Sequence, residues 1–167
     1  GVEARIARPE GGLRSIMAVI LSCAMAGAAE RLLAMTINYA NQRVQFGKPI
    51  GRQQAIQQNL AVMAENAIAC RIASQIGCSG GLTPRIGTVA TAKQVTSSAA
   101  ADIANIAHAV HGAIGISEEY DLQLFTRRLH AWRLAEGGAV FWARLLGAER
   151  LAVGEQASVD FIRFATE

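Results

Sequence analysis

The sequence predicts an all-α fold, an up-and-down antiparallel four-helix bundle followed by additional short C-terminal helices. The hydrophobic share is 51% while the aromatic share is only 5%, and a composition dominated by small aliphatic residues favours closely packed helices over sheets. Apolar residues also recur at steps of three and four over long stretches, which is the helical period. The 167 residues suit one domain, residues 1–167, with a core of its own.

Three long helices are expected first, at about 13–44, 52–77 and 84–110, each ended by glycine or proline. The first helix has its expected apolar face at Ile16, Val19, Ile20, Cys23, Ala26, Gly27, Leu33, Ile37, Ala40 and Val44. A glycine inside a helix costs roughly 1 kcal/mol relative to alanine, so Gly27 predicts a neighbour packed closely against it. A short helical piece at about 118–125, a last helix at about 139–153 and a final turn or two at 158–164 complete the expected elements.

Composition excludes several classes of function. The net charge is only +3 and no run of Lys and Arg interleaves with aromatic residues, so no nucleic-acid partner is expected. The apolar stretch Ile16–Ala29 is too short for an independent membrane span and is closely bracketed by Arg14 and Glu30. The three cysteines are odd in number and lack metal-type spacing, which predicts buried free thiols in a reducing compartment and a cytoplasmic location.

The first candidate site is the connection after the first helix, Arg43-Val44-Gln45-Phe46-Gly47-Lys48-Pro49-Ile50. An arginine at a helix end offers a planar fork that binds phosphate through two hydrogen bonds. Gln45 can donate and accept, and Phe46 supplies a flat apolar face. The alternative is purely structural: Arg43 complements the helix dipole and Phe46 plugs the core.

The second candidate site is the segment His111-Gly112-Ala113-Ile114-Gly115. Its two glycines allow a ligand to approach the backbone closely, although a simple loop closure explains them equally well. His108 and His111 are three residues apart on a helix, but no Asp, Glu or Cys nearby completes a ligand set, so no metal site is expected.

The third candidate is Glu136-Gly137-Gly138. A carboxylate on a glycine-flanked loop beside apolar residues could be partly desolvated, which raises its pKa and suits a general base. The alternative is an exposed glutamate that caps the last helix or lies in its first turn.

Taken together, these segments resemble the C-terminal helical domain of the acyl-CoA dehydrogenase family, over roughly residues 14–151. The most specific piece is Tyr39 followed by the segment 43–50 and Gln54, and the order and separation of the Gly-rich segment and of Glu136 also agree. Arg127, nine residues before Glu136, matches the approach to the family's catalytic carboxylate.

The resemblance implies oxidation of an acyl-CoA to the trans-2-enoyl-CoA, with Glu136 as the catalytic base and a hydride passing to FAD. It implies that FAD is bound by Arg43, Gln45, Phe46, Gln54, Gly112 and Gly115. It also implies cofactor contacts across a subunit interface, hence a homo- or heterotetramer built as a dimer of dimers, and an electron-transfer protein as acceptor. The family's N-terminal helical and central β-domains are absent from these residues, so the isolated domain is expected to be inactive.

Several positions depart from the family pattern. Ala109 stands where a Gln that contacts FAD is usual in the family. Ala18 stands where an Arg that contacts CoA is usual, and Arg14, one turn earlier, is a partial replacement for it. Ala135 replaces an aromatic residue that often precedes the base. These changes support a second hypothesis, a non-catalytic partner subunit of a heteromeric acyl-CoA dehydrogenase. A third, a helical interaction module without cofactor, explains the helices but not the joint order of the three segments.

Overall fold

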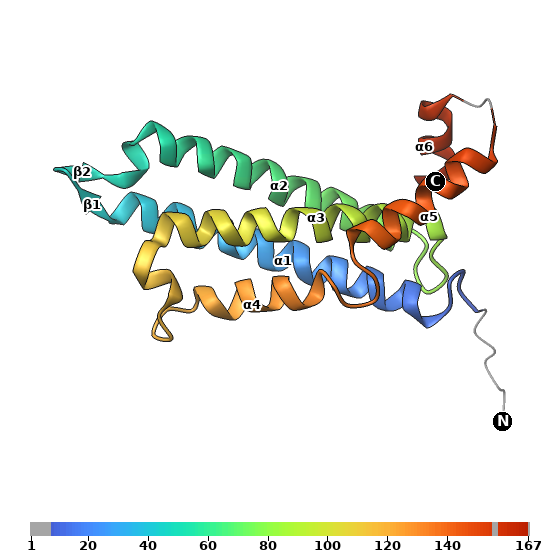
Figure 1. Ribbon diagram of the computed structural model, residues 1–167, viewed down its shortest axis with the longest axis horizontal. Helices are drawn as coiled ribbons and strands as arrows, with labels where there is room; N and C mark the ends of the chain where they lie inside the picture. The colour runs from blue at the N-terminus through green and yellow to red at the C-terminus, as the bar shows by residue number, and fades with distance from the viewer. Residues whose placement is uncertain (1–7, 155–156, 167) are drawn as a thin grey trace.

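The computed structural model describes residues 8–154 and 157–166, with side chains as far as 163. Four helices lie side by side along the long axis: α1 (Leu13–Gln42), α2 (Gln54–Cys78), α3 (Ile86–His111) and α4 (Leu122–Trp132) (Figure 1). The remaining helices, α5 (Ala139–Ala152) and α6 (Ser158–Thr166), lie at one end of this bundle. The predicted all-α bundle with short C-terminal helices is therefore confirmed.

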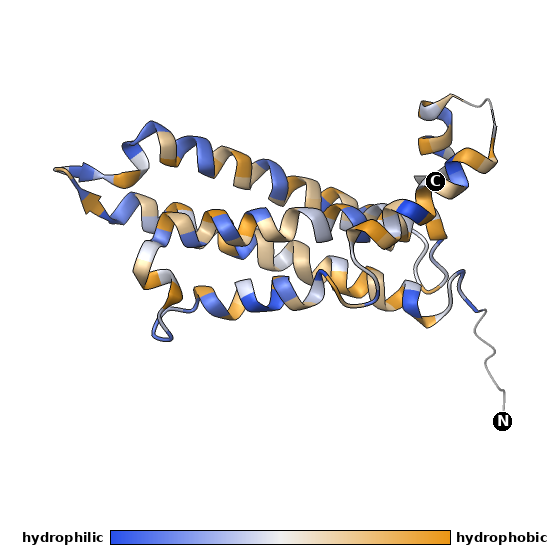
Figure 2. Ribbon diagram, viewed as in Figure 1, coloured by the Kyte–Doolittle hydropathy of each residue, from blue (hydrophilic) through white to orange (hydrophobic). Residues whose placement is uncertain are grey.

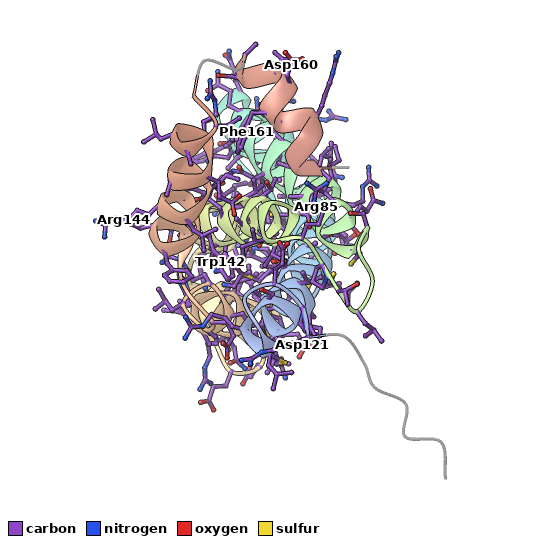
Figure 3. All side chains as sticks on the ribbon, turned by 90° about the vertical axis from the view of Figure 1, so that its right-hand side faces the viewer. Arg85, Asp121, Trp142, Arg144, Asp160 and Phe161 are labelled. Carbon is purple, nitrogen blue, oxygen red and sulfur yellow. The ribbon has the colours of Figure 1, made fainter. Side chains whose placement is uncertain are left out.

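The core is divided along the bundle. Its largest cluster joins all four bundle helices through residues such as Met25, Met63, Ile103 and Leu129. A second cluster surrounds Trp142 of α5, whose indole is buried against Ala18, Val19, Val89 and Ala90 of α1 and α3 (Figure 3). A third, small cluster of Ala40, Ile50 and Val110 closes the opposite end.

The buried face of α1 differs from the one expected. Ile20 and Ile37 are 53% and 40% exposed, whereas the buried positions are mostly small: Ser15, Ala18, Ser22, Ala26, Ala28, Ala29, Thr36 and Ala40, with Val19, Met25, Leu32 and Met35. The Ser22 and Thr36 hydroxyls donate to the helix's own carbonyl oxygens of Ala18 and Leu32, so they are buried without an unpaired polar atom. The buried face is therefore made mostly of small side chains with a few large ones, and other large aliphatic side chains of α1, such as Ile20 and Ile37, are left on the outside.

The length and composition of α1 also satisfy the criteria for a membrane-spanning helix, with a mean hydropathy of 1.7 over its most apolar window. In the bundle, 44% of that window is buried, and Figure 2 shows polar residues interspersed with apolar ones along its neighbours. A buried helix of a bundle meets the same criteria. The 30-residue length of α1 thus does not support the expectation that this apolar stretch is too short for a span, and the absence of a membrane span stays a prediction.

Two helix glycines have opposite surroundings. A Cβ on Gly27 would meet nothing within 4 Å, so the prediction of a close neighbour at this glycine is wrong. A Cβ on Gly77, in contrast, would lie 2.7 Å from the Cβ of Ala92 in α3. We expect Gly27→Ala to stabilise the protein by about 0.5–1 kcal/mol and Gly77→Ala to destabilise it by about 1–3 kcal/mol through overpacking. Urea unfolding of both variants beside the wild type measures this, and equal effects would contradict the close approach of α2 to α3.

A small β-hairpin, not predicted from the sequence, replaces the expected last turn of the first helix. Its strands, β1 (Val44–Gln45) and β2 (Lys48–Pro49), pair Val44 with Pro49 and Gln45 with Lys48. The turn residues Phe46 and Gly47 both have positive φ, 53° and 76°, which is the type I′ geometry that matches strand twist. The hairpin projects from one end of the bundle (Figure 1).

The short helix expected at 118–125 is wrong in position, because α4 runs from Leu122 to Trp132. Its buried residues Leu122, Thr126 and Leu129 follow helical spacing, while the paired arginines between them lie exposed on the outer face.

The start of α3 also differs from the expected one. Pro84 precedes α3 and is not its first residue. The carboxylate of Glu10 accepts a hydrogen bond from the first amide of that helix, Ile86 N–H, at 3.0 Å.

Candidate active site and cofactor cleft

A cleft of about 670 Å³ lies where the hairpin meets the end of α3. Of the residues expected to bind a cofactor, Arg43, Gln45 and Gly112 come together here. The cleft is also lined by Tyr39, Ile50, Gln53, Ile56, Ala109, Val110, His111, Ala113 and Ile114. Its size falls within the range of small-molecule sites, and it combines apolar walls with a few polar groups.

Arg43 is held by its backbone and leaves its side chain available. It is the C-cap of α1: its N–H donates to Tyr39 O at 2.8 Å, and its carbonyl accepts from Ile50 N at 2.8 Å. Among the residues that the structure describes, no hydrogen bond or ion pair engages its guanidinium. A fixed backbone with an uncompensated cation is a suitable binding site for an anionic group such as phosphate.

Three other predicted cofactor residues do not line this cleft. Phe46 is 90% exposed at the hairpin tip. Gln54 is exposed at the start of α2, and its neighbour Gln53 lines the cleft instead. Gly115 is buried, and a Cβ there would lie 3.0 Å from both His111 Cβ and Leu122 Cδ2, so this glycine allows close packing. A cofactor role for Phe46, Gln54 and Gly115 stays a prediction.

His111, named from the sequence only as part of the second segment and of a possible metal pair, forms a wall of the cleft. Its ring stacks on Tyr39 with centroids 4.4 Å apart, and its Nδ1 donates to Ala107 O at 2.7 Å. Burial lowers the pKa of His111, which outweighs the opposing effect of that hydrogen bond. His108 instead pairs with Thr126 at 3.0 Å, and the described residues contain no cluster of three metal-binding side chains.

Glu136 lies on a tightly held loop between α4 and α5. Its backbone is left-handed, with φ 55°, and Gly137 follows with φ 95°. The buried indole N–H of Trp142 is shared between the carbonyl oxygens of Glu136 and Gly137, at 3.1 and 3.2 Å. A Cβ on Gly137 would lie 2.6 Å from the ring of Phe141, so only glycine fits. A strained non-glycine residue held this firmly is typical of functional sites.

The Glu136 carboxylate points outward from the loop towards the start of α1. It lies 3.8 Å from Arg14 Nε, and its side chain is 39% exposed, so this chain shields it only in part. Arg14 in turn lies over the ring of Phe141, 5.5 Å from its centroid. Because Gly138 is the N-cap of α5, the alternative that Glu136 caps that helix is wrong.

The two candidate sites lie at opposite ends of α1. Glu136 pairs with Arg14, the second residue of α1, while Arg43 caps the other end of this 30-residue helix. At 1.5 Å per residue, such a helix is about 44 Å long. The guanidinium and the carboxylate of one chain therefore cannot share a ligand, and a common site requires two chains.

Comparison with known proteins identifies the family. Residues 15–152 match the model of the acyl-CoA dehydrogenase C-terminal domain. The acyl-CoA dehydrogenase IpdE2 of Mycobacterium tuberculosis is 35% identical over 73% of this chain, which corresponds to 37% of that relative. The glutaryl-CoA dehydrogenase structure with glutaryl-CoA superposes with a TM-score of 0.78 at 30% identity, over 84% of this chain and 36% of that one.

Another similar structure, the ChsE4–ChsE5 complex from Mycobacterium tuberculosis, has a TM-score of 0.72 at 26% identity, over 87% of this chain and 40% of the matched chain. The chain thus spans little more than a third of the length of these relatives. The matched region contains the hairpin, the cleft and the Glu136 loop. The chain belongs to the acyl-CoA dehydrogenase family and corresponds to its C-terminal helical domain.

Proposed function

We propose that this chain is the C-terminal domain of a longer, FAD-dependent acyl-CoA dehydrogenase that oxidises an acyl-CoA to the trans-2-enoyl-CoA. The observation that carries the proposal is the Glu136 loop. It presents a carboxylate on a strained backbone that Trp142 holds through two carbonyl oxygens. Family membership supplies the reaction class, and N-terminal domains outside these residues supply the rest of the acyl pocket.

Glu136 removes the α-proton of the thioester in this proposal. The α C–H bond breaks, its proton passes to the Glu136 carboxylate, and its electron pair forms the new C=C bond as the β-hydrogen departs as hydride. FAD, when bound, accepts that hydride. Arg14 Nε, 3.8 Å from the carboxylate, is the side chain of this chain that pairs with Glu136.

The cleft at the hairpin end fits a share of the FAD site. Arg43 supplies an uncompensated cation for the pyrophosphate, Gln45 a donor and acceptor, and Gly112, with φ 62°, lets the ligand approach the backbone. Phe46 and Gln54 extend outward from the same end, where they can reach a ligand held by a second chain. Ala109 lines the cleft with an apolar side chain, so the binding of the cofactor by this chain depends mainly on Arg43.

We propose a dimer of dimers in which Arg43 of one chain and Glu136 of another serve one flavin. The separation of about 44 Å along α1 and the exposed Phe46 support this arrangement. Large aliphatic side chains left exposed on α1 and α2, among them Ile20, Ile68 and Ile72, offer apolar surface for contacts with other domains or chains. The same proposal includes an electron-transfer protein that reoxidises the flavin. It also includes a cytoplasmic location.

A second candidate function is a partner subunit that contributes Arg43 and structure but no base. The ChsE4–ChsE5 complex is a similar assembly of two different chains, and Ala18, Ala109 and Ala135 are the changes that favour this reading here. In that case Glu136 takes no part in turnover, and a second, different subunit co-purifies with the protein.

The test is anaerobic titration of the purified full-length protein with a panel of acyl-CoA esters. We expect stoichiometric FAD and bleaching of the flavin absorbance by at least one ester, with the enoyl-CoA as product. If the protein carries FAD but no ester bleaches the flavin absorbance, with the protein alone or with its co-purifying subunit, the dehydrogenase proposal is wrong.

A further inference from the structure

Lys93 of α3 is a buried cation that the chemistry above does not use. It is the only charged residue between Arg85 and Asp102 in the sequence of α3, and its side chain is 0% exposed. Removing an ammonium group from water costs several kcal/mol unless it is well paired. A lysine in this position therefore needs a specific set of acceptors.

The ammonium finds three acceptors, one for each of its protons. Nζ donates to Ser97 Oγ at 3.0 Å, to Trp132 O at 2.9 Å and to Arg133 O at 3.3 Å. Trp132 is the last residue of α4 and Arg133 is its C-cap, where helix carbonyls lack partners and carry partial negative charge. Lys93 thus caps α4 from a different helix, about 40 residues away in sequence.

The chain that leaves this cap reaches Glu136 three residues later. Arg133 adds a second, longer tie to α3, from its Nε to Ser97 O at 3.4 Å. On the far side of the loop, Trp142 holds the carbonyls of Glu136 and Gly137. The loop is therefore fixed at both ends, by Lys93 before the glutamate and by Trp142 after it.

Lys93 and Glu136 also interact electrostatically. Burial lowers the pKa of Lys93 to about 8; the charge of Glu136 opposes this shift and that of Arg133 adds to it. Arg14, paired with Glu136 at 3.8 Å, is a second cation beside this carboxylate. Near neutral pH the lysine is mainly protonated, with all three hydrogen bonds in place, and it loses one donor and its charge as the pH rises through about 8.

We propose that Lys93 is a positioning residue for the base Glu136: its ammonium ties the C-terminal end of α4 to α3 and so fixes where the glutamate loop begins. The inference rests on the proposed function, because it gives Lys93 a role in the same reaction. It touches neither substrate nor cofactor; it acts through the backbone at Trp132 and Arg133.

The test compares Lys93→Met and Ser97→Ala in the full-length holoprotein. A displacement of the base by about 1 Å costs on the order of 100-fold in rate, so we expect Lys93→Met to lower kcat by 10- to 100-fold with little change in KM or FAD content. Ser97→Ala removes one acceptor but keeps both carbonyl contacts, and it should stay within about 3-fold of the wild type. The wild-type kcat should fall as pH rises through about 8, and this step should be missing from Lys93→Met.

Hydrogen exchange separates this proposal from the function on which it rests. Amides 133–137 should exchange faster in Lys93→Met while α1 and α2 keep their protection. This measurement decides the role of Lys93 even if no acyl-CoA proves to be a substrate. Should Lys93→Met fail to fold, Lys93→Gln, which keeps a shorter neutral donor, takes its place. Unchanged exchange in the loop, or wild-type kcat with the same step near pH 8, would overturn the proposal.

Discussion

Replacing Glu136 by glutamine in the full-length protein is expected to slow flavin reduction by acyl-CoA by about 10²- to 10⁴-fold, the usual contribution of a general base. The amide matches the carboxylate in shape but cannot accept the α-proton. The backbone carbonyl of Glu136 keeps its bond from Trp142, so the loop should retain its conformation. FAD should stay bound, because the substitution preserves the shape of the side chain and leaves unchanged the Arg43 cleft that is proposed to hold the cofactor.

Stopped-flow measurement of the reductive half-reaction checks this expectation. Glu119→Gln is the matched control, because Glu119 is an exposed carboxylate in the turn before α4 and lies outside the Glu136 loop. Its rate should equal that of the wild type. Full turnover by Glu136→Gln would remove Glu136 from the mechanism and would favour the partner-subunit reading.

The second large effect is expected at Arg43. A charge-assisted hydrogen bond contributes about 1.5–3 kcal/mol, so Arg43→Ala should raise the dissociation constant of FAD by about 10- to 100-fold. Arg52→Ala is the control, since Arg52 lies at the same end of the bundle but outside the cleft. Fluorescence of released flavin on dilution measures both variants.

Mixing the two variants, at an FAD concentration too low to load the Arg43→Ala sites, tests the arrangement of the site itself. If each flavin is served by Arg43 of one chain and Glu136 of another, co-assembly of Arg43→Ala with Glu136→Gln places two intact groups together in one of the two sites of a mixed dimer. Random pairing in a two-fold symmetric dimer then restores about a quarter of wild-type activity. A mixture no more active than its components would contradict the proposal that Arg43 and Glu136 of different chains serve one flavin.

Much of the fold followed from local rules. The helices at 52–77 and 84–110 were predicted from apolar spacing, and their approximate ends from glycine and proline, because these signals act within a few residues. The buried face of α1 was not, since its apolar residues nearly surround the helix, and only the packing of neighbours selects Ala18 and Ala29 over Ile20 and Ile37. The position of α4 was missed: the helix expected at 118–125 runs from Leu122 to Trp132, and the exposed pair Arg127-Arg128 lies on its outer face.

Some residues of the candidate site were likewise predicted from local motifs, while others depend on contacts between distant parts of the sequence. Arg43, Gln45 and Gly112 were named from motifs, and they meet in one cleft. Tyr39 against His111, and Lys93 against the end of α4, are contacts between residues far apart in the chain, and no local pattern encodes such pairs. The isolated charge of Lys93 within an apolar helix was the available signal, because a buried lysine demands acceptors.

The length of α1 has a consequence for how such proteins can diversify. In the proposed assembly each copy contributes one end of this helix to one reaction centre and the other end to a second, so its two chemical roles are separable by mutation. After a gene duplication, one copy can lose its carboxylate and its sister can lose its guanidinium, and the pair still assembles one complete centre. A rigid rod of about 44 Å therefore makes specialised, mutually dependent subunits a short evolutionary step from a symmetric ancestor.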